Sequence, residues 1–282
     1  MKTLREYLTW AEERQVAIGH FNISDSEGFK AVTEEAEKLN VPVIIGVSEG
    51  ERDFIGLDGV ISLVKTARNN GFPVFINADH TYSVEKAKLA IDAGVDSIII
   101  DAAEKTPEDN IKLTKEIVSY ARLKNPEIIV EGELGFIGKS SQILESIPDK
   151  VSEQTQTNPE EAAEFVKTTG IDLLAPSIGN IHGMVKTGNP KLNIERIKSI
   201  KAAVSVPLVL HGGSGISDDD FIKAIEAGIR IIHINTELRV AYKEGIERGI
   251  KSEEIAPYKF MIEGVEEMRK VVRNRLKLFN KL

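Results

Sequence analysis

The sequence predicts a TIM (β/α)8 barrel, an α/β fold of eight parallel strands that alternate with helices, built as one domain over residues 1–282. Short apolar runs alternate eight times with helix-like segments, which is the pattern of successive βαβ units. The chain is long enough for one such barrel and its core. No GxGxxG motif follows the first apolar run, which disfavours an open doubly wound sheet that binds a dinucleotide.

Each strand is predicted from an apolar run, and each helix from helical periodicity or a helix-start signal. In the first half the strands cover residues 16–23, 42–48, 73–80 and 97–101, and the helices cover 25–40, 57–70, 83–93 and 107–123. In the second half the strands cover 127–134, 172–179, 207–212 and 230–235, and the helices cover 158–169, 193–203, 217–227 and 237–248. A charged amphipathic helix is expected over residues 1–15, and extra C-terminal helices over 257–282.

Composition narrows the possible functions. The net charge is -8 and no Lys/Arg-rich run is interleaved with aromatic residues, so nucleic acid is not an expected partner. Without cysteine the chain has no disulfides and no thiolate zinc site, so a metal would need His, Asp or Glu ligands. No apolar stretch has the length of a signal peptide or a membrane span, and we expect a cytoplasmic protein with no membrane partner.

The histidines provide the strongest functional signal. All five fall at or just inside the end of an apolar run, and they are His20, His80, His182, His211 and His233. One histidine at such a place is more often an ordinary core or loop residue, but the carboxyl ends of barrel strands form the active site, so five together favour a shared site on one rim. Neutral imidazole is the commonest zinc donor, and His80, His182 and His211 are each followed by a small or short side chain.

A second candidate site is the HGGSG segment at residues 211–215, which precedes the helix start at Ser217. Backbone N–H groups in a Gly-rich turn at a helix N-terminus bind anions, and barrels often bind phosphate after the seventh and eighth strands. Gly212, Gly213, Ser214 and Thr236 would lie there. The alternative is that Gly-Gly-Ser-Gly is only a flexible connector.

Four segments carry a family resemblance: VFINADH, EGELGFIG, SIGNIHGMVKTGNPKLN and LVLHGGSG. They resemble, in the same order, the motifs of class II, zinc-dependent fructose- and tagatose-bisphosphate aldolases, and the likeness extends over nearly the whole chain. The resemblance implies a lyase that cleaves or forms the C3–C4 bond of a ketose bisphosphate, giving dihydroxyacetone phosphate and an aldehyde phosphate. It also implies a phosphorylated sugar as substrate and a homodimer or homotetramer.

Carried over residue by residue, the resemblance implies zinc on His80, His182 and His211. Asp79 would be the acid/base group for the C4 hydroxyl, although it could instead only orient His80. Asp101 and Glu133 match carboxylates that offer an alternative or second metal position, for a second divalent or a monovalent cation. The residues expected to hold the substrate and its phosphate are Asn22, Gly183, Gly212, Gly213, Ser214, His233, Ile234, Asn235 and Thr236.

The chain departs from the family pattern at positions that bear on chemistry. Ser141 stands where the family carries a glutamate base, and Glu145 or Glu153 from the same loop could replace it. His233 stands at a family asparagine and His20 at a small residue. Three functions therefore stay open: a zinc-dependent aldolase, a divergent lyase or epimerase with His233 or His20 as its base, and a metal- and sugar-phosphate-binding protein without turnover.

Overall fold

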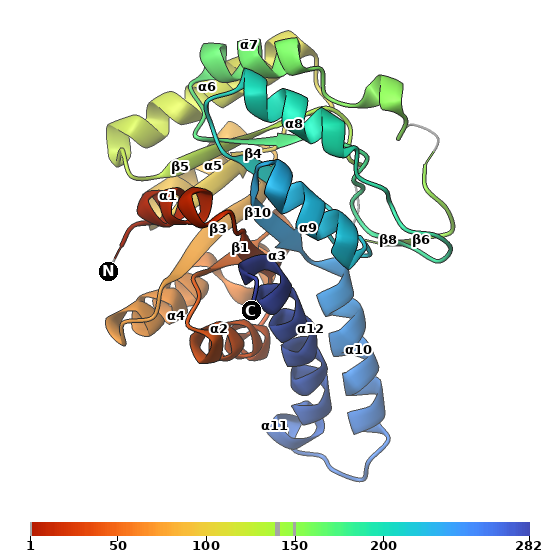
Figure 1. The fold of residues 1–282 in the computed structure, drawn as a ribbon. Coiled ribbons are helices and arrows are strands. Elements are labelled where there is room, and N and C mark those ends of the chain that lie inside the picture. The colour runs from red at the N-terminus through yellow and green to blue at the C-terminus, as the bar shows by residue number, and fades with distance from the viewer. Residues whose placement is uncertain (1, 139–141, 149–150) are drawn as a thin grey trace.

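The computed structural model describes residues 2–138, 142–148 and 151–282, and its centre is a closed barrel of eight parallel strands (Figure 1). Around the barrel the strands follow the order β1-β10-β9-β7-β5-β4-β3-β2. Their bounds are β1 Ile18–Asn22, β2 Val43–Val47, β3 Val74–Thr81, β4 Ser97–Ile100, β5 Ile129–Leu134, β7 Leu173–Pro176, β9 Leu208–Leu210 and β10 Ile229–Ile234. The predicted TIM barrel is confirmed, and every barrel strand lies within one or two residues of a predicted apolar run or inside it.

Helices surround the barrel. Their bounds are α1 Leu4–Arg14, α2 Ser26–Leu39, α3 Glu49–Ile55, α4 Leu57–Asn69, α5 Val84–Ala93, α6 Pro107–Lys124, α7 Pro159–Thr169, α8 Ile194–Ala203, α9 Asp218–Ala227, α10 Thr236–Ile250, α11 Pro257–Phe260 and α12 Ile262–Asn280. Three features were not predicted: α3, the short 3-10 helix η1 (Glu153–Thr155), and a small parallel sheet of β6 (Ile143–Leu144) and β8 (Met184–Val185). None of the helices in the described ranges is both long and apolar enough to cross a membrane.

The barrel interior changes from apolar to polar along its axis. At the amino end of the strands, Phe75 and Ile129 belong to a buried cluster that also contains Leu4 and Leu8 of α1. Helix α1 therefore closes this end of the barrel with apolar side chains, which are stabilised by removal from water. Polar groups gather at the opposite, carboxyl end.

The last helix joins the two ends of the chain. Helix α12 packs against α2, β1 and α10, and Figure 1 shows α10 and α12 side by side with α11 at their far end. The Ala17 N–H donates to the Phe279 carbonyl at 3.0 Å, and the Phe279 ring is fully buried. Between α10 and α12, a Cβ on Gly245 would lie 2.5 Å from the Gly264 Cα, so glycine is required for this close approach.

Candidate active site

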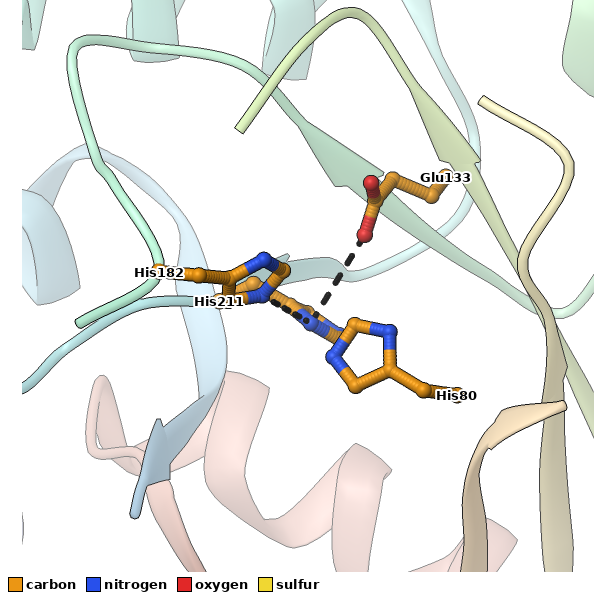
Figure 2. Close-up of side chains that lie close together, drawn as sticks. All are labelled: His80, Glu133, His182 and His211. Atoms are coloured by element: carbon orange, nitrogen blue, oxygen red, sulfur yellow. Dashed lines mark hydrogen bonds and ion pairs between the residues drawn. The ribbon is translucent and has the colours of Figure 1, made fainter. Parts of the chain in front are cut away.

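Four side chains from different parts of the barrel rim converge on one point. His80 comes from β3, Glu133 from β5, and His182 and His211 from the loops after β7 and β9. Their ligand atoms all lie within 4.8 Å of one another, and Figure 2 shows the side chains pointing toward a common centre. Three imidazoles and one carboxylate form a donor set that suits a divalent ion such as zinc.

Two of the imidazoles are oriented by acceptors on the side away from this centre. His80 Nδ1 lies 2.8 Å from Asp101 Oδ2, and His182 Nδ1 lies 2.8 Å from the Gly138 carbonyl. Each of these nitrogens is the donor when the imidazole is neutral, which leaves Nε2 of both rings as an electron-pair donor at the centre.

The third imidazole is oriented the other way round. His211 Nε2 lies 2.7 Å from Glu131 Oε1, and neither side chain has any exposed surface. His211 Nδ1 therefore faces the centre, 3.4 Å from His182 Nε2 and 3.7 Å from Glu133 Oε2. A hydrogen-bonded acceptor behind every imidazole is the usual arrangement around metal-binding histidines, because it fixes both the tautomer and the ring plane.

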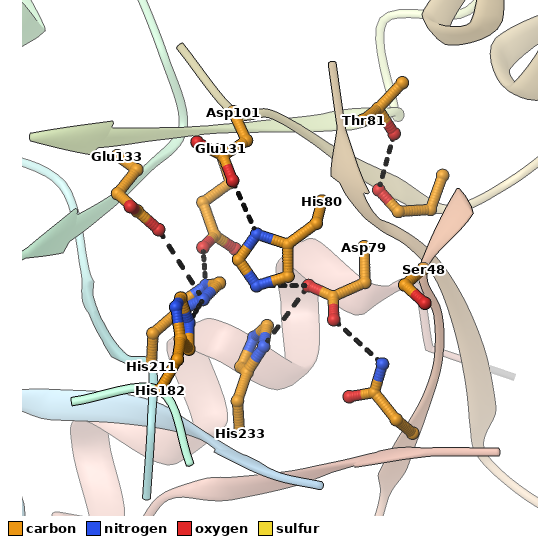
Figure 3. Close-up of polar contacts among 12 residues, drawn as sticks. Ser48, Asp79, His80, Thr81, Asp101, Glu131, Glu133, His182, His211 and His233 are labelled. Atoms are coloured by element: carbon orange, nitrogen blue, oxygen red, sulfur yellow. Dashed lines mark hydrogen bonds and ion pairs between the residues drawn. The ribbon is translucent and has the colours of Figure 1, made fainter. Parts of the chain in front are cut away.

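A β-bulge explains how two neighbouring residues of β3 both reach the site. Ala78 and Thr81 pair with Ile98 and Ile100 of β4, so β3 holds one extra residue between these pairs. His80 has a φ of 38°, which is uncommon for a residue with a Cβ. The bulge breaks the alternation of a regular strand, and Figure 3 shows Asp79 and His80 on the same side.

Asp79 is buried beside this centre among polar groups. The Asn22 side-chain amide donates to Asp79 Oδ2 at 2.9 Å, His233 Nδ1 lies 3.5 Å from Oδ1, and Arg52 donates to the Asp79 carbonyl at 3.1 Å. Burial opposes ionisation, but the charge of His80 and the adjacent His233 ring outweigh it and hold the pKa of Asp79 well below its usual range. Asp79 is therefore an ionised carboxylate at neutral pH.

The site opens into a cavity of about 440 Å³, whose wall includes His80, Glu133, His182, Lys105 and Arg239. A smaller pocket of about 20 Å³ lies beside it. The residues that line this inner pocket are Asn22, Asp79, His80, His182, Gly183, His211, Gly212, Ser214, His233, Asn235 and Thr236. A small polar ligand can thus contact the histidine centre, Asp79 and the Gly-rich loop together.

Comparisons with known proteins agree with this geometry. Residues 2–282 match the family model described as "Fructose-bisphosphate aldolase class-II". The chain is 36% identical to a fructose-bisphosphate aldolase of Staphylococcus aureus, over 98% of this chain and 96% of that protein. It is 39% identical to a fructose-bisphosphate aldolase of Geobacillus stearothermophilus, over 86% of this chain and 84% of that protein. The crystal structure of the YdjI aldolase from Escherichia coli K12 superposes with a TM-score of 0.84, at 35% identity over 98% and 96% of the two chains.

The chain belongs to the class II fructose-bisphosphate aldolase family. Members of this family are metal-dependent lyases, and the cluster of His80, Glu133, His182 and His211 is a group that can bind a metal. The predictions of family, fold and enzyme class are therefore confirmed. The roles of individual residues stay predictions.

Protonation in this aldolase differs sharply between neighbouring groups. Burial lowers the pKa of His182 to about 3, with the charges of His80 and His211 acting in the same direction. Burial raises the pKa of Glu133 to about 8, helped by the charge of Asp101. Burial lowers the pKa of His80, but the charge of Asp79 and the hydrogen bond to Asp101 outweigh burial and raise this pKa to about 10. In the metal-free aldolase His182 is therefore neutral, whereas Glu133 and His80 carry protons at pH 7.

The Gly-rich loop packs against the start of α10. Gly212 has a φ of 62°, and a Cβ there would lie 2.0 Å from the Ile181 carbonyl oxygen, so glycine is required. The Ser214 hydroxyl accepts from the backbone N–H groups of Asn235 at 3.3 Å and Glu237 at 3.2 Å. These donors belong to the first turn of α10, the type of helix terminus that binds phosphate in barrels.

Not every predicted residue lines the inner pocket. The Gly213 N–H donates to the His233 carbonyl at 3.0 Å, and the Ile234 side chain is buried in the core, so both pack β9 and β10 together. Asp101 lies outside the four-residue metal group and binds His80 instead. His20 is not at the strand end: it lies inside β1 and is fully buried.

Two groups of residues remain: those predicted to supply a base from the loop, and the site residues that were not predicted. Ser141 lies outside the described residues. Glu145 forms an ion pair with Lys186 and its side chain is 81% exposed, so in this structure it does not face the cavity. The orienting role of Glu131 was missed, although its place at the end of an apolar run was a visible signal. Arg52 of the unpredicted α3 was also missed.

Proposed function

We propose that this protein is a zinc-dependent aldolase that cleaves and forms the C3–C4 bond of a ketose bisphosphate such as fructose or tagatose 1,6-bisphosphate. The observation that carries the proposal is the orientation of three imidazoles and Glu133 toward one point beside an ionised Asp79. His80, His182 and His211 would hold the ion. Glu133 is a fourth or alternative ligand, and Asp101 acts by orienting His80.

A bound zinc ion would act as a Lewis acid that stabilises the negative charge developing on the substrate as the C3–C4 bond breaks. Asp79 takes the proton of the C4 hydroxyl during cleavage. The C3–C4 electron pair then remains on C3 while C4 becomes the aldehyde carbon. In condensation Asp79 returns the proton to the C4 oxygen. Its low pKa keeps it ionised at neutral pH, so it is free to accept the proton during cleavage.

The two ends of the substrate would occupy different parts of the cavity. The triose phosphate end would lie against the residues at the mouth of the inner pocket, where Gly212 and Ser214 lie at the start of α10. The far end of the substrate fits the larger cavity, whose wall carries the cations of Lys105 and Arg239. Arg239 is already paired with the buried Glu51, so its position is fixed before the substrate binds.

A second candidate function is a divergent lyase or epimerase on another sugar phosphate. His233 favours it, because this ring lines the inner pocket, where its Nδ1 lies 3.5 Å from Asp79 Oδ1 and its Nε2 has no hydrogen-bond partner among the described residues. His233 would then exchange the substrate proton that a loop glutamate handles elsewhere in the family. Burial, and then the cost of placing a proton on this ring beside the His20 and His211 imidazoles, hold the pKa of His233 well below its usual value, so it would be a weak base.

The deciding experiment incubates the zinc-loaded protein with fructose 1,6-bisphosphate and with tagatose 1,6-bisphosphate and follows triose phosphate release. Release from either sugar, abolished by a chelator and restored by zinc, supports the aldolase. Stoichiometric zinc binding with no release from either sugar contradicts it and favours a binding protein or another sugar phosphate. A cytoplasmic location and a homodimer or homotetramer stay part of the proposal, and sedimentation of the purified protein measures the latter.

A further inference from the structure

Three histidine rings form a column inside the barrel. His20 and His233 are direct register partners in the neighbouring strands β1 and β10, and His211 directly follows the adjacent strand β9. The His20 and His233 rings stack with centroids 3.4 Å apart and an interplanar angle of 6°. The His233 and His211 rings lie 4.0 Å apart at 29°. His233 is thus held between two flat rings, one of which belongs to the candidate metal group.

The far end of the column depends on a residue without a side chain. A Cβ on Gly46 of β2 would lie 2.1 Å from His20 Cε1 and 2.6 Å from Nε2, far inside van der Waals contact. His20 therefore occupies the space that a side chain at position 46 would fill. His20 and Gly46 form one packing unit, in which a change at either residue changes the other.

His20 contacts its neighbour through the ring face rather than through its nitrogens. Neither His20 nitrogen has a hydrogen-bond partner among the described residues, and His20 does not line the inner pocket, whereas His233 does. Burial lowers the pKa of His20 to about 4, so the stacked ring is neutral. His20 can therefore affect the inner pocket only through the His233 ring, on which it stacks.

We propose that His20, seated on Gly46, is a positioning residue that fixes the ring plane of His233 and thereby the place of Asp79 in the inner pocket. The expected effect on turnover rests on the proposed function, whereas the effect of His20 on the position of the His233 ring does not. Without His20, one face of the His233 ring is uncovered, and the ring can turn about its side-chain bonds. Its Nδ1 then leaves the 3.5 Å contact with Asp79 Oδ1, which no other described imidazole approaches as closely.

The kinetic test compares His20→Ala, Gly46→Ala and the double variant in zinc-loaded enzyme. Each single variant should lose about tenfold or more in kcat, the range typical of residues that orient active-site groups, with KM and zinc content little changed. The double variant should lose no more than His20→Ala, because the new Cβ then enters empty space. Multiplied losses in the double variant, or wild-type kcat in His20→Ala, would overturn the proposal.

Two further variants separate positioning from general stability. His20→Phe keeps a flat ring and should retain more of kcat than His20→Ala; equal losses in two folded variants would contradict a ring-face role. Gly245→Ala is the matched control, because its Cβ meets the Gly264 Cα at 2.5 Å between α10 and α12, away from the cavity. It should lower the melting temperature and leave the kcat of the folded enzyme unchanged.

A spectroscopic measurement tests the position of the His233 ring without any substrate. The ring protons of His233, assigned by their absence in His233→Asn, should lie upfield in the metal-loaded wild type because two rings cover them. They should move toward ordinary positions in His20→Ala and in Gly46→Ala. Unchanged signals would refute the stack as a constraint on His233. Shifted signals without turnover of either ketose bisphosphate would refute the proposed function and leave the positioning role standing.

Discussion

Replacing Glu131 tests whether the metal centre depends on the group behind His211. The Glu131→Leu variant removes the acceptor of a 2.7 Å hydrogen bond between two side chains that have no exposed surface. Partners of metal-binding histidines are typically worth 10–100-fold in metal affinity, about 1.4–2.8 kcal/mol. Because this hydrogen bond is fully enclosed and water cannot replace the lost acceptor, we expect a weakening near 100-fold.

The assay is competition for zinc with a coloured chelator at fixed pH, followed by metal analysis of the recovered protein. Glu131→Gln is the matched control, because its amide oxygen still accepts from His211 Nε2 and keeps Nδ1 facing the metal. It should lose much less affinity than Glu131→Leu. Wild-type zinc affinity in a folded Glu131→Leu protein would refute the claim that Glu131 sets the orientation of His211.

Three further predictions concern the same centre. His211→Ala should lose zinc and activity together. Asp79→Ala should keep zinc and lose about 10²–10⁴-fold in kcat. Full turnover by Asp79→Ala would mean that Asp79 only orients His80. The pKa values of His80 and Glu133 are raised to about 10 and about 8, so both side chains must lose a proton to bind the ion. Zinc affinity should therefore rise at least about tenfold per pH unit near neutrality. Calorimetry in buffers of different ionisation enthalpy should detect the released protons. If His233 is the base, as in the second candidate function, His233→Asn should lower kcat and remove an acid limb of the pH–rate profile. The lowered pKa of His233 places that limb below about pH 6.5, and an unchanged profile contradicts proton transfer by this ring.

The barrel and the histidine centre were predictable because both follow from local pattern. Apolar runs of strand length mark the barrel strands, and the carboxyl ends of those strands meet at one rim whatever their separation in sequence. This pattern placed all five histidines on one rim, whereas the choice of His80, His182 and His211 as metal ligands came from the family resemblance. Their convergence with Glu133 follows from barrel closure rather than from a local motif.

What could not be predicted depends on register and on backbone detail. The bulge that turns both Asp79 and His80 inward comes from a mismatch with β4 that no residue type announces. The depth of His20 inside β1 depends on the space at Gly46 of the next strand. Helix α3 does have a capping signal, since Ser48 and Glu51 form a capping box, but seven residues are too few for helical periodicity to be recognised.

The contact between the two ends of the chain has a consequence for synthesis. Strand β1 is made first, yet one of its edges is covered only when β10 pairs with it, and its outer face only when α12 arrives with Phe279. Until β10 has left the ribosome, the nascent chain carries two open strand edges, the kind of surface that templates aggregation. Removing α12 from the gene should therefore reduce soluble yield far more than it affects any residue of the cavity.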